Sequence, residues 1–190
     1  MKASDWSRAS GPLAAVLPGF EPFARGFVRR HEWVAECIYV DSSSHSRTAF
    51  YVQAFALPLF VPTDHLYFDY GGRVGDRWED VDAELVDGVE RVLPTLRELA
   101  TLDGLRRKAQ RPNQDLHHAE VHLCVALICG ERERFDALAE QIRGWIEQVP
   151  WQRPIIERCV GLAATVHDSG EEIGRDRLRA CVPGVLSLLT

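Results

Sequence analysis

The sequence of 190 residues lacks any apolar run long enough to cross a bilayer, and it lacks an excess of positive charge. A transmembrane helix needs roughly 18 or more consecutive apolar residues, and no such stretch occurs. The net charge is -6, whereas binding to nucleic acid or to an anionic membrane needs a concentrated positive surface. The sequence therefore predicts no membrane or nucleic-acid association, and it favours a neutral or basic partner.

Paired cysteine motifs and an export signal are missing as well. The five cysteines are an odd number without CxxC spacing, which indicates free thiols in a reducing compartment: Cys37, Cys124, Cys129, Cys159 and Cys181. The apolar run at 12–20 is interrupted by two prolines and ended by Glu21, so it does not match a signal peptide. Together these features predict a cytoplasmic protein.

Three common catalytic or phosphate-binding motifs are absent, namely GxSxG, GxGxxG and GxxxxGK[ST]. The segment "DSSSHS" at 41–46 holds the residue types of a hydrolytic triad, but adjacent residues in one turn cannot adopt triad geometry. The glycines of "YGGRVGDRWED" at 70–80 are expected to turn the chain from sheet to helix. The sequence thus predicts no catalytic residue and no cofactor.

Aromatic and β-branched residues concentrate in the first part of the chain. Segments 33–40 and 47–60 are predicted to form an antiparallel hairpin, and 65–70 a further strand before the glycines. A short helix at 12–25 is expected to precede them. Residues 12–75 therefore form a sheet-rich half.

Helical periodicity replaces this pattern in the second half, 76–190. Apolar residues recur every three or four positions at 77–100, where Pro94 is expected to kink or split the helix. A clear amphipathic helix follows at 131–148, and with the preceding helix it should form an antiparallel hairpin over 114–148. The prediction is a single α+β domain: an N-terminal antiparallel sheet with one flanking helix, followed by a C-terminal bundle of about five helices.

Two of these helical segments share a similar four-residue sequence. "CVAL" at 124–127 recurs as "CVGL" at 159–162, an offset close to that of helical-hairpin repeats. Two units are fewer than a repeat array generally needs.

The stretch "DLHHAEVHLCVALICG" at 115–130 raises the question of a metal site. Helical spacing places His118 and His122 on one face, while Glu120 points elsewhere and Cys129 lies about 10 Å along the axis from His122. The alternative is a buried central helix, because its C-terminal half is apolar all round. We favour the buried helix and predict no metal, with His118 and His122 as the pair that would test it.

Partner binding is predicted for Tyr70, Arg73 and Trp78, because tyrosine, arginine and tryptophan commonly anchor interfaces. Tyr and Trp also pack cores, so a structural role is the alternative. The acidic segment at 79–90 and the basic one at 106–111 are either steering patches or solvated helix faces, and solvated faces are the usual outcome.

Residues 12–105 carry a series of short motifs: Gly26 and Phe27 followed by Arg29, the strands at 33–60, the turn from Arg73 to Gly75, Trp78, and Leu93 with Pro94. In these motifs the N-terminal half resembles a family of uncharacterised bacterial domains. Members of that family look like small cytoplasmic proteins, some similar to immunity proteins that neutralise a toxin by binding it. The resemblance implies no catalytic residues.

We therefore expect a non-enzymatic, immunity-like protein that binds a protein partner such as a basic toxin domain. The alternative is an enzyme of hydrolase or metal-dependent type, whose site is assembled from residues distant in sequence. The oligomeric state is left open.

Overall fold

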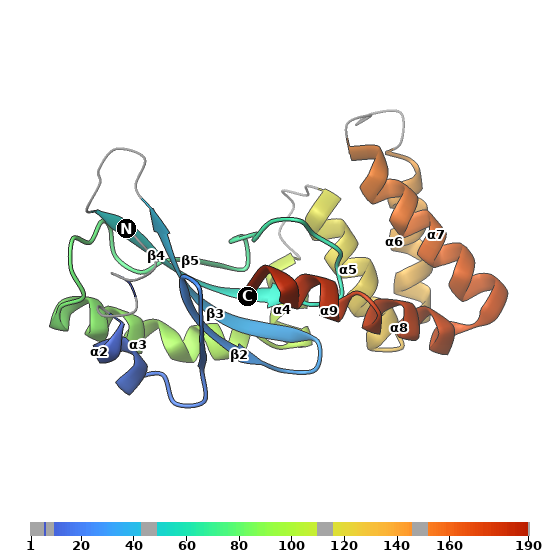
Figure 1. Ribbon diagram of the computed structural model, residues 1–190. Helices are drawn as coiled ribbons and strands as arrows, with labels where there is room; N and C mark the ends of the chain where they lie inside the picture. Colours follow the sequence, from blue (N-terminus) through green and yellow to red (C-terminus); the bar gives the residue numbers. More distant parts are fainter. Residues whose placement is uncertain (1–5, 7–9, 43–48, 110–115, 146–151, 190) are drawn as a thin grey trace. The chain divides into compact units, whose positions relative to one another are not determined.

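A computed structural model describes residues 6, 10–42, 49–109, 116–145 and 152–189. The chain divides into two compact units (Figure 1). The sheet unit comprises residues 1–57, 64–101 and 186–190, and the helical unit comprises residues 58–63 and 102–185. Helix 83–99 thus belongs with the sheet, although its sequence pattern is that of the helical half.

The sheet has five strands whose order in space follows their order in the chain. Its strands are β1 (Glu21–Phe23), β2 (Gly26–Arg30), β3 (Val34–Ser42), β4 (Phe50–Pro58) and β5 (Gly71–Arg73). Antiparallel pairing joins β1 to β2, β2 to β3 and β4 to β5. The sheet followed by helices confirms the predicted α+β class.

Three sequence predictions about this unit are wrong in detail. The helix expected at 12–25 is only α2 (Gly11–Ala15), and β1 and β2 follow it. Residues 65–70 form no strand; the strand begins at Gly71 instead. A Cβ atom on Gly71 would lie 2.0 Å from the carbonyl oxygen of Ala54 on β4, so glycine here permits close strand pairing rather than a turn.

Helix α3 (Ala83–Leu99) covers one face of the sheet. Its apolar residues Leu85, Val89 and Leu96 are buried in one cluster with sheet residues such as Ile38 and Val52. Pro94 does not split α3. The proline replaces an N–H that would bond the carbonyl of Glu90, and both residues are exposed, so water can satisfy that carbonyl.

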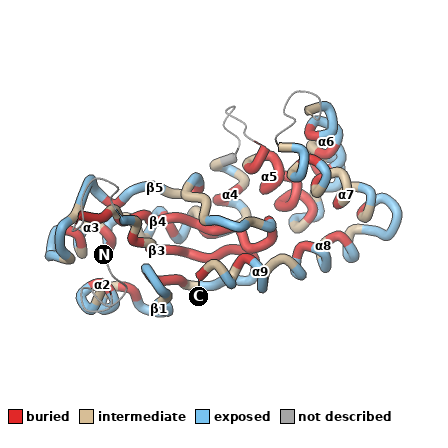
Figure 2. The backbone as a smooth tube through the Cα atoms, turned by 45° about the horizontal axis from the view of Figure 1, so that its top comes forward, coloured by how far each residue is buried: buried red, intermediate tan, exposed pale blue. Residues whose placement is uncertain are grey.

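The helical unit is built around α5. The unit contains α4 (Leu102–Ala109), α5 (Leu116–Ile128), α6 (Arg132–Arg143), α7 (Arg153–Ser169), α8 (Glu171–Arg179) and most of α9 (Val182–Leu186), which precedes the short 3-10 helix η2 (Ser187–Leu189). Helix α5 contacts α4, α6, α7 and α8, and it is buried along nearly its whole length (Figure 2). The predicted buried central helix and its hairpin with α6 are both confirmed.

The ends of this hairpin also match the sequence pattern in part. Helix α5 ends just before Gly130, whose φ of 71° suits glycine. Helix α6 ends at Arg143, and residues 146–148 of the predicted helix lie outside the described residues. The similar sequences "CVAL" and "CVGL" lie on α5 and α7, the first helices of two successive hairpins.

Across the described ranges, no helix combines the length and the apolar character that crossing a membrane requires.

Candidate functional site

The candidate site is the connection from β5 to α3, residues 75–84, which we call the acidic turn. Gly75 has a φ of 66°, and a Cβ atom there would lie 2.5 Å from the Cζ2 atom of Trp78. The indole therefore packs directly over the glycine backbone. The Trp78 Nε1 group donates a hydrogen bond of 2.7 Å to the carbonyl of Val74. These contacts fix the path of the turn.

The main chain of Trp78 is tied to the sheet as well. Phe50 and Trp78 exchange two backbone hydrogen bonds of 2.9 and 3.0 Å. At the other end of the turn, Asp82 caps α3 by accepting a 2.9 Å bond from the N–H of Leu85. A carboxylate near a helix N-terminus also interacts favourably with the helix dipole. The acidic turn is thus held at both ends by ordinary secondary-structure contacts.

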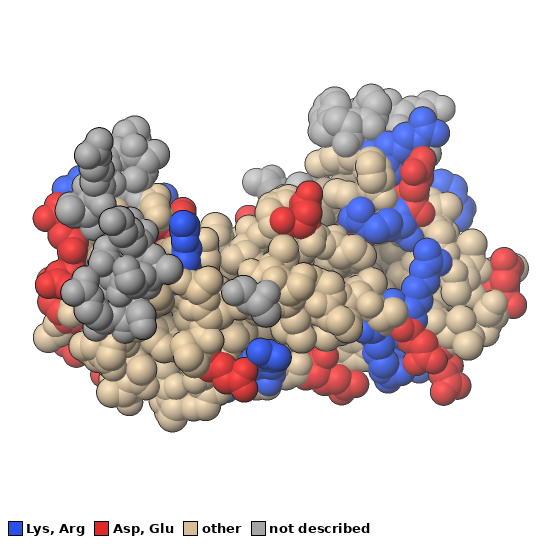
Figure 3. Space-filling view, viewed as in Figure 1, with Lys and Arg blue, Asp and Glu red and all other residues tan. Residues whose placement is uncertain are grey.

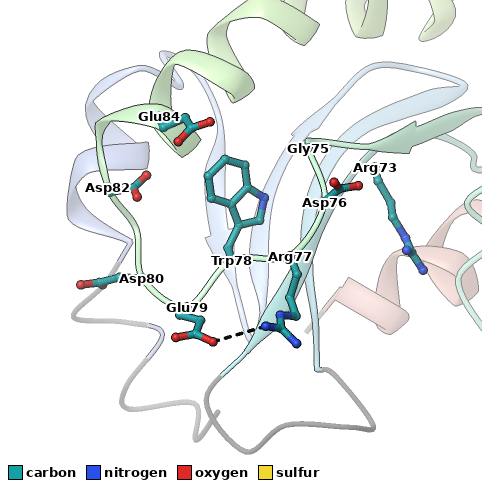
Figure 4. A pocket seen from close by; sticks show the side chains of 9 residues that line it. All are labelled: Arg73, Gly75, Asp76, Arg77, Trp78, Glu79, Asp80, Asp82 and Glu84. Carbon is teal, nitrogen blue, oxygen red and sulfur yellow. Dashed lines mark ion pairs between the residues drawn. The ribbon is translucent and has the colours of Figure 1, made fainter.

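Five carboxylates are presented by this turn. They line an open depression of about 780 Å³ together with Arg73, Arg77 and Trp78, and all five are exposed: Asp76, Glu79, Asp80, Asp82 and Glu84. The side chains fan out around the indole (Figure 4). Arg77 pairs with Glu79 at 3.6 Å, and this is the one ion pair recorded within the lining set among the described residues. The depression is therefore electronegative.

The negative charge extends beyond the turn along the same part of the chain. Residues 64–90 contain nine carboxylates and two arginines, and every one of the nine carboxylates is exposed. In Figure 3 the red side chains of the sheet unit gather where α3 begins. Such a concentration of one sign attracts a cationic partner over a distance of about 10 Å at ordinary ionic strength.

Of the three residues predicted to bind a partner, Arg73 and Trp78 line the same depression, and Tyr70 does not. Tyr70 is fully buried, so its side chain is not available at the surface. Arg73 is exposed and lies over the ring of Tyr51, 4.3 Å from its centroid. Trp78 is half-buried and packs against the core of the sheet unit. Figure 4 shows Arg73 directed away from the indole, so the acidic carboxylates, and not this trio, define the surface.

Arginines of the helical unit are largely neutralised by neighbouring carboxylates, and Figure 3 shows blue side chains next to red ones there. The recorded pairs are Arg106–Asp103, Arg106–Glu131, Arg132–Asp136, Arg134–Glu131, Arg143–Glu140, Arg153–Glu157, Arg158–Glu120, Arg175–Glu171 and Arg179–Asp176. The exposed pairs among these are worth little individually, in contrast to the buried Arg158–Glu120 pair, but all of them reduce the local positive potential. Over the described part of the chain, Arg77–Glu79 is the one such pair recorded within the acidic turn.

His118 and His122 both lie on α5, one turn apart as their spacing predicts, and both are half-buried. Within the described ranges, no group of three or more His, Cys, Asp or Glu side chains is arranged to hold a metal ion. Burial, with a smaller effect of the nearby Arg134, lowers the pKa of His122 to about 4. A cationic neighbour of this kind also disfavours a metal ion, so the pair offers no support for a metal centre.

A buried ion pair on α5 was not anticipated from sequence. The carboxylate of Glu120 is nearly inaccessible, and Arg158 of α7 donates to both of its oxygens at 2.9 Å. Burial raises the pKa of Glu120, and the Arg158 guanidinium opposes that rise. A charge within an apolar helix does predict a partner, but the sequence offers many arginines and does not select this one.

A second buried carboxylate lies in the sheet unit. Glu36 on β3 is fully buried, and Arg29 on β2 donates to its two oxygens at 2.9 and 2.6 Å. His31 donates to the same carboxylate at 2.7 Å. The Arg29 guanidinium also lies over Phe20, 4.7 Å from the ring centroid. These contacts satisfy the carboxylate fully, which is the arrangement of a structural ion cluster.

Two other sequence features fall partly outside the described residues. Of the segment "DSSSHS", residues 43–46 are not described, so its arrangement is not tested. The basic segment 106–111 is described up to residue 109, and its Arg106 is paired with Asp103 and Glu131.

Comparison with protein-family models, with curated proteins and with solved structures found no match. The resemblance to immunity proteins stays a prediction.

Proposed function

We propose that this protein binds a basic protein partner through the acidic turn, in the manner of an immunity protein that neutralises its partner by direct contact. The observation that supports the proposal is the set of five exposed carboxylates around Trp78, which outnumber the two arginines of the same depression, Arg73 and Arg77. A surface of this kind suits a cationic protein such as a nuclease toxin domain, whose own positive surface is built for phosphate.

Electrostatic complementarity supports speed and selectivity of association more than raw affinity. Trp78 adds a rigid aromatic surface beside the carboxylates, and a lysine or arginine of the partner gains from contact with both. Because Nε1 of Trp78 is already bonded to Val74, the ring offers an apolar and π surface rather than a hydrogen bond. The expected interface is polar, with an aromatic residue near its centre.

The test begins with capture of partners from the host. Wild-type protein on a support should retain one stoichiometric partner of high pI at low salt and lose it as salt is raised, because exposed charges are screened. A variant with Asp76→Asn, Glu79→Gln and Asp80→Asn should retain much less of it. Asp82 is left intact because it caps α3.

A matched control changes the charge by the same amount elsewhere. The control variant carries Glu133→Gln, Asp168→Asn and Glu172→Gln, all exposed residues of the helical unit. It should capture the partner as well as the wild-type protein does. Equal loss in both variants would mean that net charge alone, and not the acidic turn, is responsible, and recovery of no basic protein under any condition would refute the proposal.

A further inference from the structure

A separate feature of the helical unit concerns His122 and goes beyond the proposed function. The Nε2 atom of His122 is buried and, within the described ranges, has no hydrogen-bond partner. The ring is instead held by a hydrogen bond to the backbone of Arg106 on α4, which must involve the other nitrogen, Nδ1. In a neutral imidazole that donates through Nδ1, Nε2 is an acceptor without a donor, and this costs little free energy. A protonated imidazole has an unsatisfied N–H there.

Charged groups around this ring make protonation more costly still. The neighbouring elements carry Asp103 and Arg106 on α4 and Glu131 and Arg134 at the start of α6, and of these the Arg134 charge disfavours the protonated ring. Glu131 is shared, because both arginines donate to it, and Asp103 is engaged by Arg106. The carboxylates are therefore already committed to arginines when a proton arrives on His122.

The other titratable neighbours, His118 and Cys129, do not lower the cost of protonating His122. His118 lies one turn earlier on α5 and adds positive charge when protonated. Burial, followed by the nearby Glu131 carboxylate, raises the pKa of Cys129, so its thiol stays protonated and supplies no negative charge.

We propose that His122 is an acid-sensitive latch, which holds α4 to the α5–α6 hairpin while neutral and releases it when protonated. The hydrogen bond to Arg106 joins α5 to the main chain of α4, and the Arg106–Glu131 pair joins α4 to α6. A proton on His122 places an unsatisfied donor and a third positive charge at the junction of these three helices. Local opening removes both.

The direction of the pH dependence follows from linkage. Burial, chiefly, lowers the pKa of folded His122 to about 4 from the ordinary histidine value of 6.5. The stability contributed by the neutral ring is complete above 6.5 and is lost as the pH falls from 6.5 towards 4. For a fully shielded group the opening constant would rise about thirtyfold by pH 5. His122 is only half-buried, so screening reduces the expected rise to about tenfold.

Hydrogen exchange, expressed as protection factors, measures the opening of α4, α5 and α6 at pH 7 and at pH 5. The wild-type protein should show an opening constant about tenfold larger at pH 5. His122→Gln, which can still donate to Arg106 but cannot take a proton, should show less than about a twofold change. The matched control His118→Gln, on the same helix face, should behave like the wild-type protein.

An equal rise in His122→Gln and in the wild-type protein would overturn the latch. If His122→Gln does not fold, a pH titration of the wild-type histidine resonances by nuclear magnetic resonance provides a second test of the proposal. The His122 resonances should then titrate well below pH 6, whereas titration at the ordinary histidine value would overturn the proposal.

Discussion

Replacing Arg158 with methionine should lower the free energy of unfolding by about 3 kcal/mol at pH 7.5. The substitution keeps much of the aliphatic volume but leaves the buried carboxylate of Glu120 without its two hydrogen bonds. Removing one partner of a buried pair typically costs about 3 to 5 kcal/mol, and the lower end applies because Arg158 itself is partly exposed. Urea denaturation measures the difference.

The difference in free energy of unfolding between Arg158→Met and the wild-type protein should become smaller as the pH falls. Burial already raises the pKa of Glu120, and loss of the guanidinium lets it rise further. A carboxyl whose folded pKa lies above its unfolded value gains relative stability on protonation, so the variant should approach the wild-type protein towards pH 5.

Arg153→Met is the matched control, since Arg153 forms an exposed pair with Glu157 on the same helix. It should cost less than about 0.5 kcal/mol. Similar losses from both substitutions would contradict the account of Glu120 as a buried charge that depends on Arg158.

Gly71→Ala should lower the free energy of unfolding by about 3 kcal/mol and disturb the acidic turn. The added Cβ would lie 2.0 Å from the carbonyl oxygen of Ala54 and 2.5 Å from the Cα atom of Phe55. Both are backbone atoms of β4, so no side chain can move aside, and the pairing of β4 with β5 must separate. Because β5 leads directly into residues 75–84, the fluorescence of Trp78 should change as well.

The neighbouring glycine supplies the control. A Cβ atom on Gly72 would meet nothing within 4 Å, although Gly72 belongs to the same strand. Gly72→Ala should therefore change stability by less than about 0.5 kcal/mol. A large loss from Gly72→Ala, or a negligible one from Gly71→Ala, would show that the strand pairing differs from the one described.

The parts of the fold that sequence could predict are those with strong local periodicity. Leu85, Val89 and Leu96 recur at helical spacing, and α3 forms there. The apolar residues of α5 predicted a buried helix, and its contacts with α4, α6, α7 and α8 confirm this prediction. In both segments the amphipathic or apolar pattern is complete within one element, so no distant residue is needed to interpret it.

The parts that sequence missed depend on contacts between distant residues. Strand β2 ends in Arg29 and Arg30, and two adjacent charged residues are not typical of a strand. The reason they fit is that Arg29 lies opposite Glu36 of β3 and pairs with it. Gly71 reads as a turn residue, and only the nearby backbone of β4 shows that it permits pairing. Tyr70 has the residue type of an interface anchor, but its burial depends on contacts that the fold makes.

The candidate site was predicted in part. The acidic character of residues 79–90 is visible in the sequence, but a run of charges is usually a solvated face and does not by itself identify a binding surface. The structure adds the packing of Trp78 on Gly75 and the open depression lined by carboxylates. Arg73 and Trp78 are close in sequence yet point apart, which spacing alone does not reveal.

Calorimetric titration of the captured basic partner into three proteins tests the central claim most directly. The wild-type protein and the control variant with Glu133→Gln, Asp168→Asn and Glu172→Gln should bind with affinities within about twofold of each other. The variant with Asp76→Asn, Glu79→Gln and Asp80→Asn should bind about tenfold more weakly or worse, with a smaller dependence on salt. Equal affinity of all three proteins would contradict binding through the acidic turn.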